Sequence, residues 1–273
     1  MIATIDEVRD FARTKLQQAR DGGETIPFHL IERYKAKAMS ADSRKEGSME
    51  ASISIVDDPK FSVLKHGTGQ LAWAVVLSVD LRNSTSRAIN YGAENTYLTM
   101  HTYLPTMEYL IGRSNGKVIG LRGDGLFAGF GITEVDEKRV TFTTEIASKA
   151  ASDSVKCGRG MVEAIEDVIN PLLEADGIPA GLQIGVGIDS GKVIITRIGL
   201  DTANEVTAYG PCVNEACKRA DGYNEVYISS VVNEYYPTSA TGKVRFSLIS
   251  NKGYRVDKYP YDVLSRKHPG RPR

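Results

Sequence analysis

The sequence predicts an α+β domain whose elements follow a split βαββαβ order, and three observations support this prediction. Residues 72–79 form a continuous apolar run of strand length, which is typical of a strand buried on both faces. Two short apolar segments enclose a Gly-Asp-Gly sequence at 123–125, which is typical of a hairpin turn. Stretches with helical periodicity separate these strands. One sheet covered by helices fits a domain of about 200 residues.

The N-terminal part of the chain differs from this domain. A charged helical pattern covers 5–20 and ends at a Gly-Gly pair, a second covers 28–39, and a polar run follows over 40–48. We expect residues 1–67 to form a helical extension with a connector that acts as a support or a dimerisation element. Residues 68–265 are then the main domain, and 266–273 a basic, solvated tail.

The first half of the main domain contains two helical regions around the hairpin. Serine and threonine side chains are available to cap a helix over 84–103. Pro105 interrupts this pattern, so we expect a second helix that ends at Gly112. The hairpin strands follow at 117–122 and 126–130, and a long helix covers 140–174 with a break near 158–160.

The second half begins with an alternating pattern. It predicts a strand over 182–188, a turn over 189–191 and a returning strand over 192–198. Pro211 suits the first position of a further helix. Short strands are expected last, near 226–228, 244–249 and 261–264.

The composition limits the partners. Of 273 residues, 34 are Lys or Arg and 34 are Asp or Glu, so no global charge favours nucleic acid or an anionic membrane. No apolar run approaches the roughly 20 residues of a membrane helix, and none resembles a signal peptide. The three cysteines lack metal-binding spacing. We therefore expect a cytoplasmic protein with free thiols and neither a nucleic-acid nor a membrane partner.

Two aspartates stand at strand ends. Asp80 follows the buried strand directly, and Asp124 lies in the glycine-flanked turn. A carboxylate beside a core is costly unless something positive binds it, and oxygen ligands at fixed positions suit Mg²⁺ or Mn²⁺. The alternative is that both are ordinary turn aspartates, because Asp favours turns.

The helix that begins at Pro211 carries a second polar pair. Asn214 and Lys218 are four residues apart and so share one helix face. A neutral donor and a cation one turn apart suit the oxygens of a ribose or phosphate group. The alternative is a solvated helix face without a ligand.

Taken together, four segments resemble the catalytic domain of class III adenylate and guanylate cyclases. They are, in order, Val-Asp-Leu-Arg-Asn-Ser-Thr at 79–85, Gly-Asp at 123–124, Gly-Ile-x-x-Gly-x-Val at 187–193, and Gly-x-x-Val-Asn-x-Ala at 210–216. Lys218 stands where the family usually has arginine. The resemblance covers about 72–264, and it implies a ferredoxin-like βαββαβ core that works as a head-to-tail homodimer with shared active sites.

The resemblance also implies roles for single residues. Asp80, the Leu81 carbonyl and Asp124 would hold two divalent metal ions, Mn²⁺ or Mg²⁺. Asn214 would orient the ribose, and Lys218 would neutralise the α-phosphate, with the neighbouring Arg219 as its alternative. A late phosphate-binding lysine of the family aligns weakly with Lys252.

The base-reading positions differ from those of purine cyclases. Adenylate cyclases have lysine and aspartate where this chain has Gly120 and Thr207, and guanylate cyclases generally have glutamate at the first position. Strand periodicity places Arg122 on the same face as Gly120. Arginine only donates hydrogen bonds, so it suits a base with carbonyl acceptors such as uracil or cytosine. The alternative for Arg122 is a salt bridge at a dimer interface.

This pattern resembles the pyrimidine cyclases of the bacterial Pycsar antiphage system. The resemblance implies cyclisation of UTP or CTP to a messenger that a separately encoded effector senses. Uracil has two carbonyls against one in cytosine, so UTP is favoured. The alternatives are a cytidylate cyclase, a divergent adenylate or guanylate cyclase, and a nucleotide-sensing domain without activity. A diguanylate cyclase would need an acidic residue where Gly125 stands.

Overall fold

A mixed β-sheet organises the chain in the computed structural model. The structure describes residues 2–22, 54–55, 58, 60–135, 142–200, 203–237, 246–257 and 263–265. Its central strands are β2 (Gly69–Leu81), β3 (Gly116–Arg122), β4 (Gly125–Glu134) and β5 (Ile184–Leu200). They lie in the order β3-β4-β2-β5, and all three pairs are antiparallel. With α3 (Ser84–Arg113) and α4 (Thr144–Ala164) between them, they confirm the predicted βαββαβ order.

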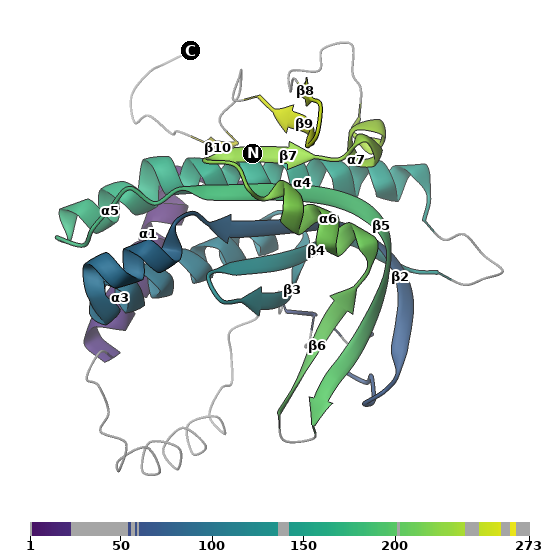
Figure 1. The fold of residues 1–273 in the computed structure, drawn as a ribbon, viewed down its shortest axis with the longest axis horizontal. Coiled ribbons are helices and arrows are strands. Elements are labelled where there is room, and N and C mark those ends of the chain that lie inside the picture. Colours follow the sequence, from purple (N-terminus) through teal and green to yellow (C-terminus); the bar gives the residue numbers. More distant parts are fainter. Residues whose placement is uncertain are drawn as a thin grey trace.

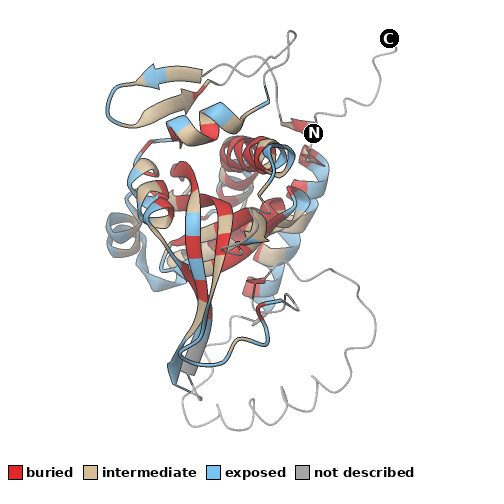
Figure 2. Ribbon diagram, turned by 90° about the vertical axis from the view of Figure 1, so that its right-hand side faces the viewer, coloured by how far each residue is buried: buried red, intermediate tan, exposed pale blue. Residues whose placement is uncertain are grey.

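Helices cover both faces of this sheet, as Figure 1 shows. On one face, α3 and α4 pack on the strands around a large apolar core that includes Val75, Leu77 and Val79 of β2. On the other face, α6 (Pro211–Arg219) packs on β2 and β5, and a smaller apolar cluster includes Ala74 and Val76. Alternate residues of β2 thus enter different cores, which explains the continuous apolar run. The buried residues in Figure 2 gather on the sheet and the helices against it.

The N-terminal helix belongs to the same core. Helix α1 (Ile5–Gly22) packs against α3, and its Val8, Ala12 and Leu16 side chains are fully or almost fully buried there. Strand β1 (Ala3–Thr4) pairs in parallel with β10 (Leu264–Ser265). These contacts hold α1 against α3 in the same core. The boundary at residue 67 stays a prediction, and the segments expected at 28–39, 40–48 and 266–273 lie outside the described residues.

The prediction of two helices separated at Pro105 is wrong in the place of the separation. Helix α3 consists of two helical segments that meet at a kink at Gly92, with φ 79°, and the second segment continues through Pro105. The buried side chains of its second half, which include Leu110 and Ile111, pack into the core. This packing stabilises the helix, and its contribution exceeds the cost of the one backbone hydrogen bond that proline cannot donate.

The long helix is also continuous where a break was expected near 158–160. Gly158 faces the Val186 and Val226 side chains, which a Cβ atom would approach to 3.0 and 3.2 Å. The glycine therefore allows close packing of α4 on the sheet. The α-helix instead passes into a π-helical turn at Ile165–Ile169 and then into α5 (Asn170–Ala175).

The turn predicted at 189–191 is wrong, because β5 runs without interruption. Asp189, Ser190 and Gly191 pair with Val76, Val75 and Ala74 of β2. Their turn-forming side chains find partners inside the sheet: Arg219 donates to Asp189, the Trp73 indole donates to Ser190, and Ser190 donates to the Ala74 carbonyl. The returning strand is β6 (Ala203–Tyr209), and the β5–β6 hairpin extends from the body of the domain (Figure 1).

Smaller elements complete the sheet beyond β5. Strand β7 (Glu225–Ile228) pairs in parallel with β5, and β9 (Gly253–Val256) and β8 (Phe246–Ile249) follow. Helix α7 (Ser230–Tyr235) connects β7 to this edge. Strand β9 was not predicted, because its four residues are too few to show a clear alternating pattern. None of the described helices is long and apolar enough to span a membrane.

Candidate active site

The two predicted aspartates meet at one end of the sheet. Asp80 lies near the end of β2, and Asp124 occupies the turn between β3 and β4. Because β2 pairs with β4, Asp80 stands opposite Gly125, the residue after Asp124. A Cβ atom at Gly125 would lie 2.7 Å from the Val79 carbonyl oxygen and 3.3 Å from Asp80 Oδ1. Glycine is therefore required for the turn to lie against the Asp80 carboxylate.

The donor set at this end of the sheet suits a hard divalent cation. Two carboxylates and the Leu81 backbone carbonyl are oxygen ligands, and the Asp80 side chain remains 38% exposed. The buried Leu81 side chain fixes the backbone between the strand and α3. The described residues contain no cluster of three or more His, Cys, Asp or Glu side chains that could hold a metal ion by themselves. The residues fit Mg²⁺ or Mn²⁺ ions that take further oxygens from a substrate or water.

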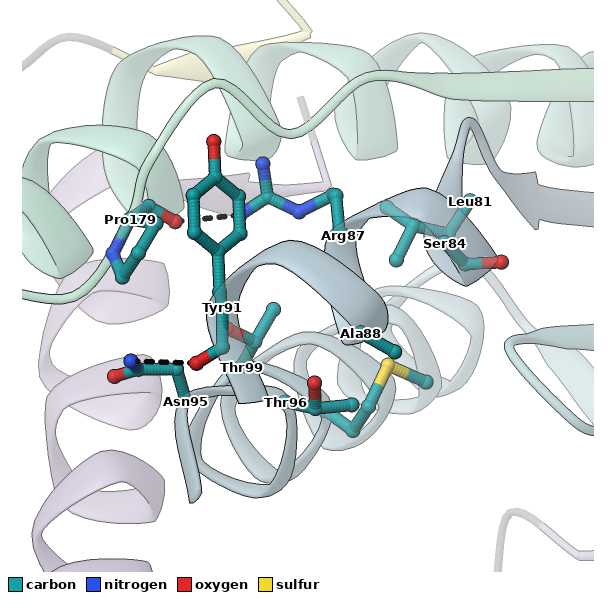
Figure 3. Close-up of a pocket in the computed structure, with 10 residues that line it drawn as sticks. Leu81, Ser84, Arg87, Ala88, Tyr91, Asn95, Thr96, Thr99 and Pro179 are labelled. Carbon is teal, nitrogen blue, oxygen red and sulfur yellow. Dashed lines mark hydrogen bonds between the residues drawn. The ribbon is translucent and has the colours of Figure 1, made fainter. Parts of the chain in front are cut away.

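A charged anchor behind this loop fixes the start of α3 (Figure 3). Asn83 precedes the helix in the left-handed conformation, with φ 57°. Arg87 donates to the Pro179 and Ala180 carbonyls, and its guanidinium lies 5.1 Å from the centre of the Tyr91 ring. A cavity of about 30 Å³ lies among these side chains, which is too small for a nucleotide. Arg87 thus holds the loop after Asp80 against the segment before β5.

A second cavity, of about 270 Å³, lies between β3, β6 and α6. It combines an apolar wall with a few polar groups, as small-molecule sites do. The residues that line it are Val76, Ile119, Arg122, Phe127, Thr207, Ala208, Tyr209, Val213, Asn214 and Cys217. Three of them, Arg122, Thr207 and Asn214, were predicted from the sequence to contact a nucleotide.

Gly120 completes the group of predicted base-reading positions. A Cβ atom there would meet only Thr207 Oγ1, at 3.9 Å, so Gly120 and Thr207 face each other across β3 and β6. Arg122 Nη2 donates to Thr207 Oγ1 at 3.4 Å. The structure therefore brings Gly120, Arg122, Thr207 and Asn214 together, and the absence of a side chain at Gly120 leaves room beside the guanidinium.

Two residues of this region were missed from the sequence. Glu205 lies 3.6 Å from Arg122 Nη2, and strand periodicity on β6 places it on the face of Thr207. Cys217 lies one helical turn after Asn214. The residue is exposed, and partial desolvation beside the cavity raises the pKa of its thiol. The signals for both are local periodicities, which become informative only once β6 and α6 are located.

Three other predicted residues lie apart from the cavity in one chain. Lys218 is exposed and donates to Glu215 at 2.8 Å. Arg219 is mostly buried, and it donates to the Asp189 carboxylate at 3.1 Å and to Glu215. Lys252 precedes β9, near the opposite edge of the sheet from β3 and β4, and it donates to Asp221 at 2.7 Å. The contacts of Arg219 fit a structural ion pair that holds α6 on β5.

Comparisons with known proteins are consistent with these features. No protein-family model matches the chain. The chain is 23% identical over 186 residues to a uridylate cyclase from Rhodovulum sp. (strain MB263). The alignment covers 66% of this chain and 71% of that protein. It is 25% identical over 198 residues to a cytidylate cyclase from Escherichia coli. This alignment covers 71% of this chain but 41% of that longer protein.

Solved structures support the same relationship at the level of fold. The adenylyl cyclase CyaB from P. aeruginosa superimposes with a TM-score of 0.57 at 22% identity, over 74% of this chain and all of the other. The guanylyl cyclase Cya2 gives 0.53 at 23% identity, over 69% of this chain and 90% of the other. The chain has the class III nucleotidyl cyclase fold, and its resemblance to that family, and within it to the pyrimidine cyclases, is confirmed.

Proposed function

We propose that this protein is a pyrimidine nucleotide cyclase that converts UTP to 3′,5′-cyclic UMP and pyrophosphate. The observation that carries the proposal is the cavity of about 270 Å³ in which Arg122 reaches Thr207 beside the open position of Gly120. Neither purine-reading side chain of adenylate cyclases is present there. The similarity to a uridylate and a cytidylate cyclase supports the same substrate class.

Arg122 determines the choice of base in this proposal. A guanidinium group offers only hydrogen-bond donors, and both carbonyls of uracil accept. Glu205 and Thr207 contact its Nη2 atom, and Arg122 lines the cavity together with apolar residues and a few polar ones. Cytosine retains one carbonyl, so a cytidylate cyclase is the nearest alternative, and a divergent purine cyclase is the next.

The carboxylate end would hold two divalent ions through Asp80, Asp124 and the Leu81 carbonyl. Such ions, when bound, assist attack by the ribose 3′-oxygen and stabilise the leaving pyrophosphate. Asn214, at the cavity, would donate to the ribose and fix its orientation. Lys218 lies one turn further along the same helix face and would neutralise the α-phosphate.

The positions of these groups support a homodimer with shared active sites. Neither aspartate is among the residues that line the cavity, and Lys218 and Lys252 point to partners on the surface of their own chain. In the proposed head-to-tail dimer, the carboxylates of one chain face the cavity of the other, and Lys252 contributes a phosphate contact. Arg219 remains in its ion pair with Asp189.

The cellular role proposed for the product rests on the Pycsar resemblance. Cyclic UMP would act in the cytoplasm as a second messenger of antiphage defence. A separately encoded effector would sense it, and neither nucleic acid nor a membrane is proposed as a partner of the enzyme.

Product analysis tests the reaction directly. The purified protein is incubated with ATP, GTP, CTP or UTP in the presence of Mn²⁺, and products are resolved by mass. Cyclic UMP as the main product supports the proposal, and cyclic CMP would transfer it to the cytidylate alternative. A cyclic purine would contradict the assignment of Gly120 and Thr207. Absence of any cyclic product from an intact dimer would favour a nucleotide sensor without activity.

Cys217 provides a binding test that does not depend on turnover. Cys157 and Cys212 are buried, so an alkylating reagent should label Cys217 selectively. Because partial desolvation raises the pKa of this exposed thiol, less thiolate is present at neutral pH, and labelling should accelerate as the pH rises. A UTP analogue with a methylene group between the α- and β-phosphates should slow labelling at least about tenfold at saturation, by mass action.

The matched variant for this labelling experiment is Cys217→Ser, which should abolish the signal in intact protein. Mass spectrometry of the labelled peptide identifies the site. An equal labelling rate with and without saturating analogue would place the nucleotide outside this cavity.

A further inference from the structure

Arg82 forms an ion pair with Asp80, one of the two carboxylates proposed to bind metal. Arg82 Nη2 forms an ion pair with Asp80 Oδ2, two residues earlier in the chain. The Arg82 backbone N–H donates to the Gln183 carbonyl at 2.8 Å, which fixes the loop beside β5. The guanidinium therefore stands at the end of the sheet where the two aspartates meet.

The surroundings of Arg82 do not satisfy its side chain. The side chain is 19% exposed, and its Nε atom is buried without a partner among the described residues. The buried Tyr103 hydroxyl also lacks a partner in the described part of the chain. Burial raises the pKa of the Tyr103 phenol, the Asp124 charge raises it further, and the Arg82 charge lowers it. Buried polar atoms without partners are rare, which indicates that this end of the sheet is incomplete without a further group.

A divalent ion and this guanidinium cannot both have full use of Asp80. Each is positive, and each takes its attraction from the same carboxylate oxygens, so one weakens the binding of the other. A guanidinium also has a second preferred partner, because its planar fork binds phosphate oxygens as well as a carboxylate. The arrival of a triphosphate with its metal would supply that partner.

We propose that Arg82 couples metal entry to triphosphate entry: it holds Asp80 while the site is empty and transfers to the phosphate oxygens when the metal–nucleotide complex binds. This inference rests on the proposed metal role of Asp80. Arg82 is then both a counter-ion that limits binding of metal alone and a contact that strengthens binding of the complex. Coupling of this kind is reciprocal, so each ligand raises the affinity for the other.

The test measures Mn²⁺ affinity without nucleotide, from the electron paramagnetic resonance signal of free Mn²⁺. Arg82→Ala removes the competing charge and should tighten Mn²⁺ binding about tenfold. Arg82→Lys keeps the charge, so its Mn²⁺ affinity should remain close to that of the original protein. Arg9→Ala is the matched control, because it removes an arginine from another Arg–Asp pair, on the exposed face of α1, and should change nothing.

The second measurement is of nucleotide affinity, on which Arg82→Ala should have the opposite effect. With Mn²⁺ present, Arg82→Ala should weaken binding of the methylene analogue of UTP about tenfold, measured by calorimetry. A purely structural ion pair predicts no opposite changes, so equal or weaker Mn²⁺ affinity, or unchanged analogue affinity, would overturn the inference. Asp80→Asn separates the two proposals: if it binds Mn²⁺ as the original protein does, the metal site itself is wrong, whatever Arg82 does.

Discussion

Asp124→Asn is expected to abolish cyclic nucleotide formation while the protein remains folded. Asparagine has nearly the shape of aspartate but lacks the charge that a divalent cation requires. Asp124 occupies the turn between β3 and β4 and is partly exposed, so the neutral side chain can remain there without a buried unpaired group. Loss of one electrostatic contact at a reacting centre typically costs about 10²–10³ in turnover, and we expect a fall at the upper end of this range, about 1,000-fold.

The measurement is cyclic UMP formation with UTP and Mn²⁺, together with thermal unfolding and the mass of the assembly in solution. Asp6→Asn is the matched control, since Asp6 lies on the exposed face of α1 and pairs with Arg9. It should leave turnover unchanged. Undiminished turnover in the Asp124→Asn protein would remove Asp124 from the metal site and with it the two-metal assignment.

The sheet was predictable because its signals are local. The apolar run of β2 and the Gly-Asp-Gly turn before β4 each fix an element from fewer than ten residues. The errors arose where side chains find partners far along the chain. Asp189 and Ser190 favour turns in isolation, but Arg219 and Trp73 satisfy them inside a strand. Pro105 likewise marks no helix end once the core holds α3 together.

The same distinction applies to the candidate site. The strand ends placed Asp80 and Asp124, and strand periodicity placed Arg122 beside Gly120. Periodicity did not show that Arg82 turns back onto Asp80 or that Glu205 reaches Arg122, because both contacts depend on side-chain direction in the folded chain. Neighbouring residues on α6 also differ in ways the sequence does not reveal, since Lys218 is exposed whereas Arg219 is held by Asp189.

The Arg122→Ala variant is expected to lose its preference for UTP with little loss of stability. The Arg122 side chain is 49% exposed, and its described contacts are a 3.4 Å hydrogen bond to Thr207 and a 3.6 Å ion pair with Glu205. Such exposed pairs contribute about 0–1 kcal/mol to folding. A hydrogen bond from a charged donor to the base is worth about 1.5–3 kcal/mol, so kcat/KM for UTP should fall about 10- to 100-fold.

The change in preference is the informative quantity. Competition between UTP and ATP in one reaction gives the ratio of their kcat/KM values, and this ratio should fall because only the uracil contact is lost. Arg122→Lys keeps a donor without the planar fork, so its ratio of kcat/KM values should lie between those of the original protein and Arg122→Ala. An unchanged ratio combined with loss of the dimer would instead place Arg122 in a salt bridge at the interface. The base would then be read by other groups of the cavity, with Asn214 and Thr207 as the remaining polar candidates.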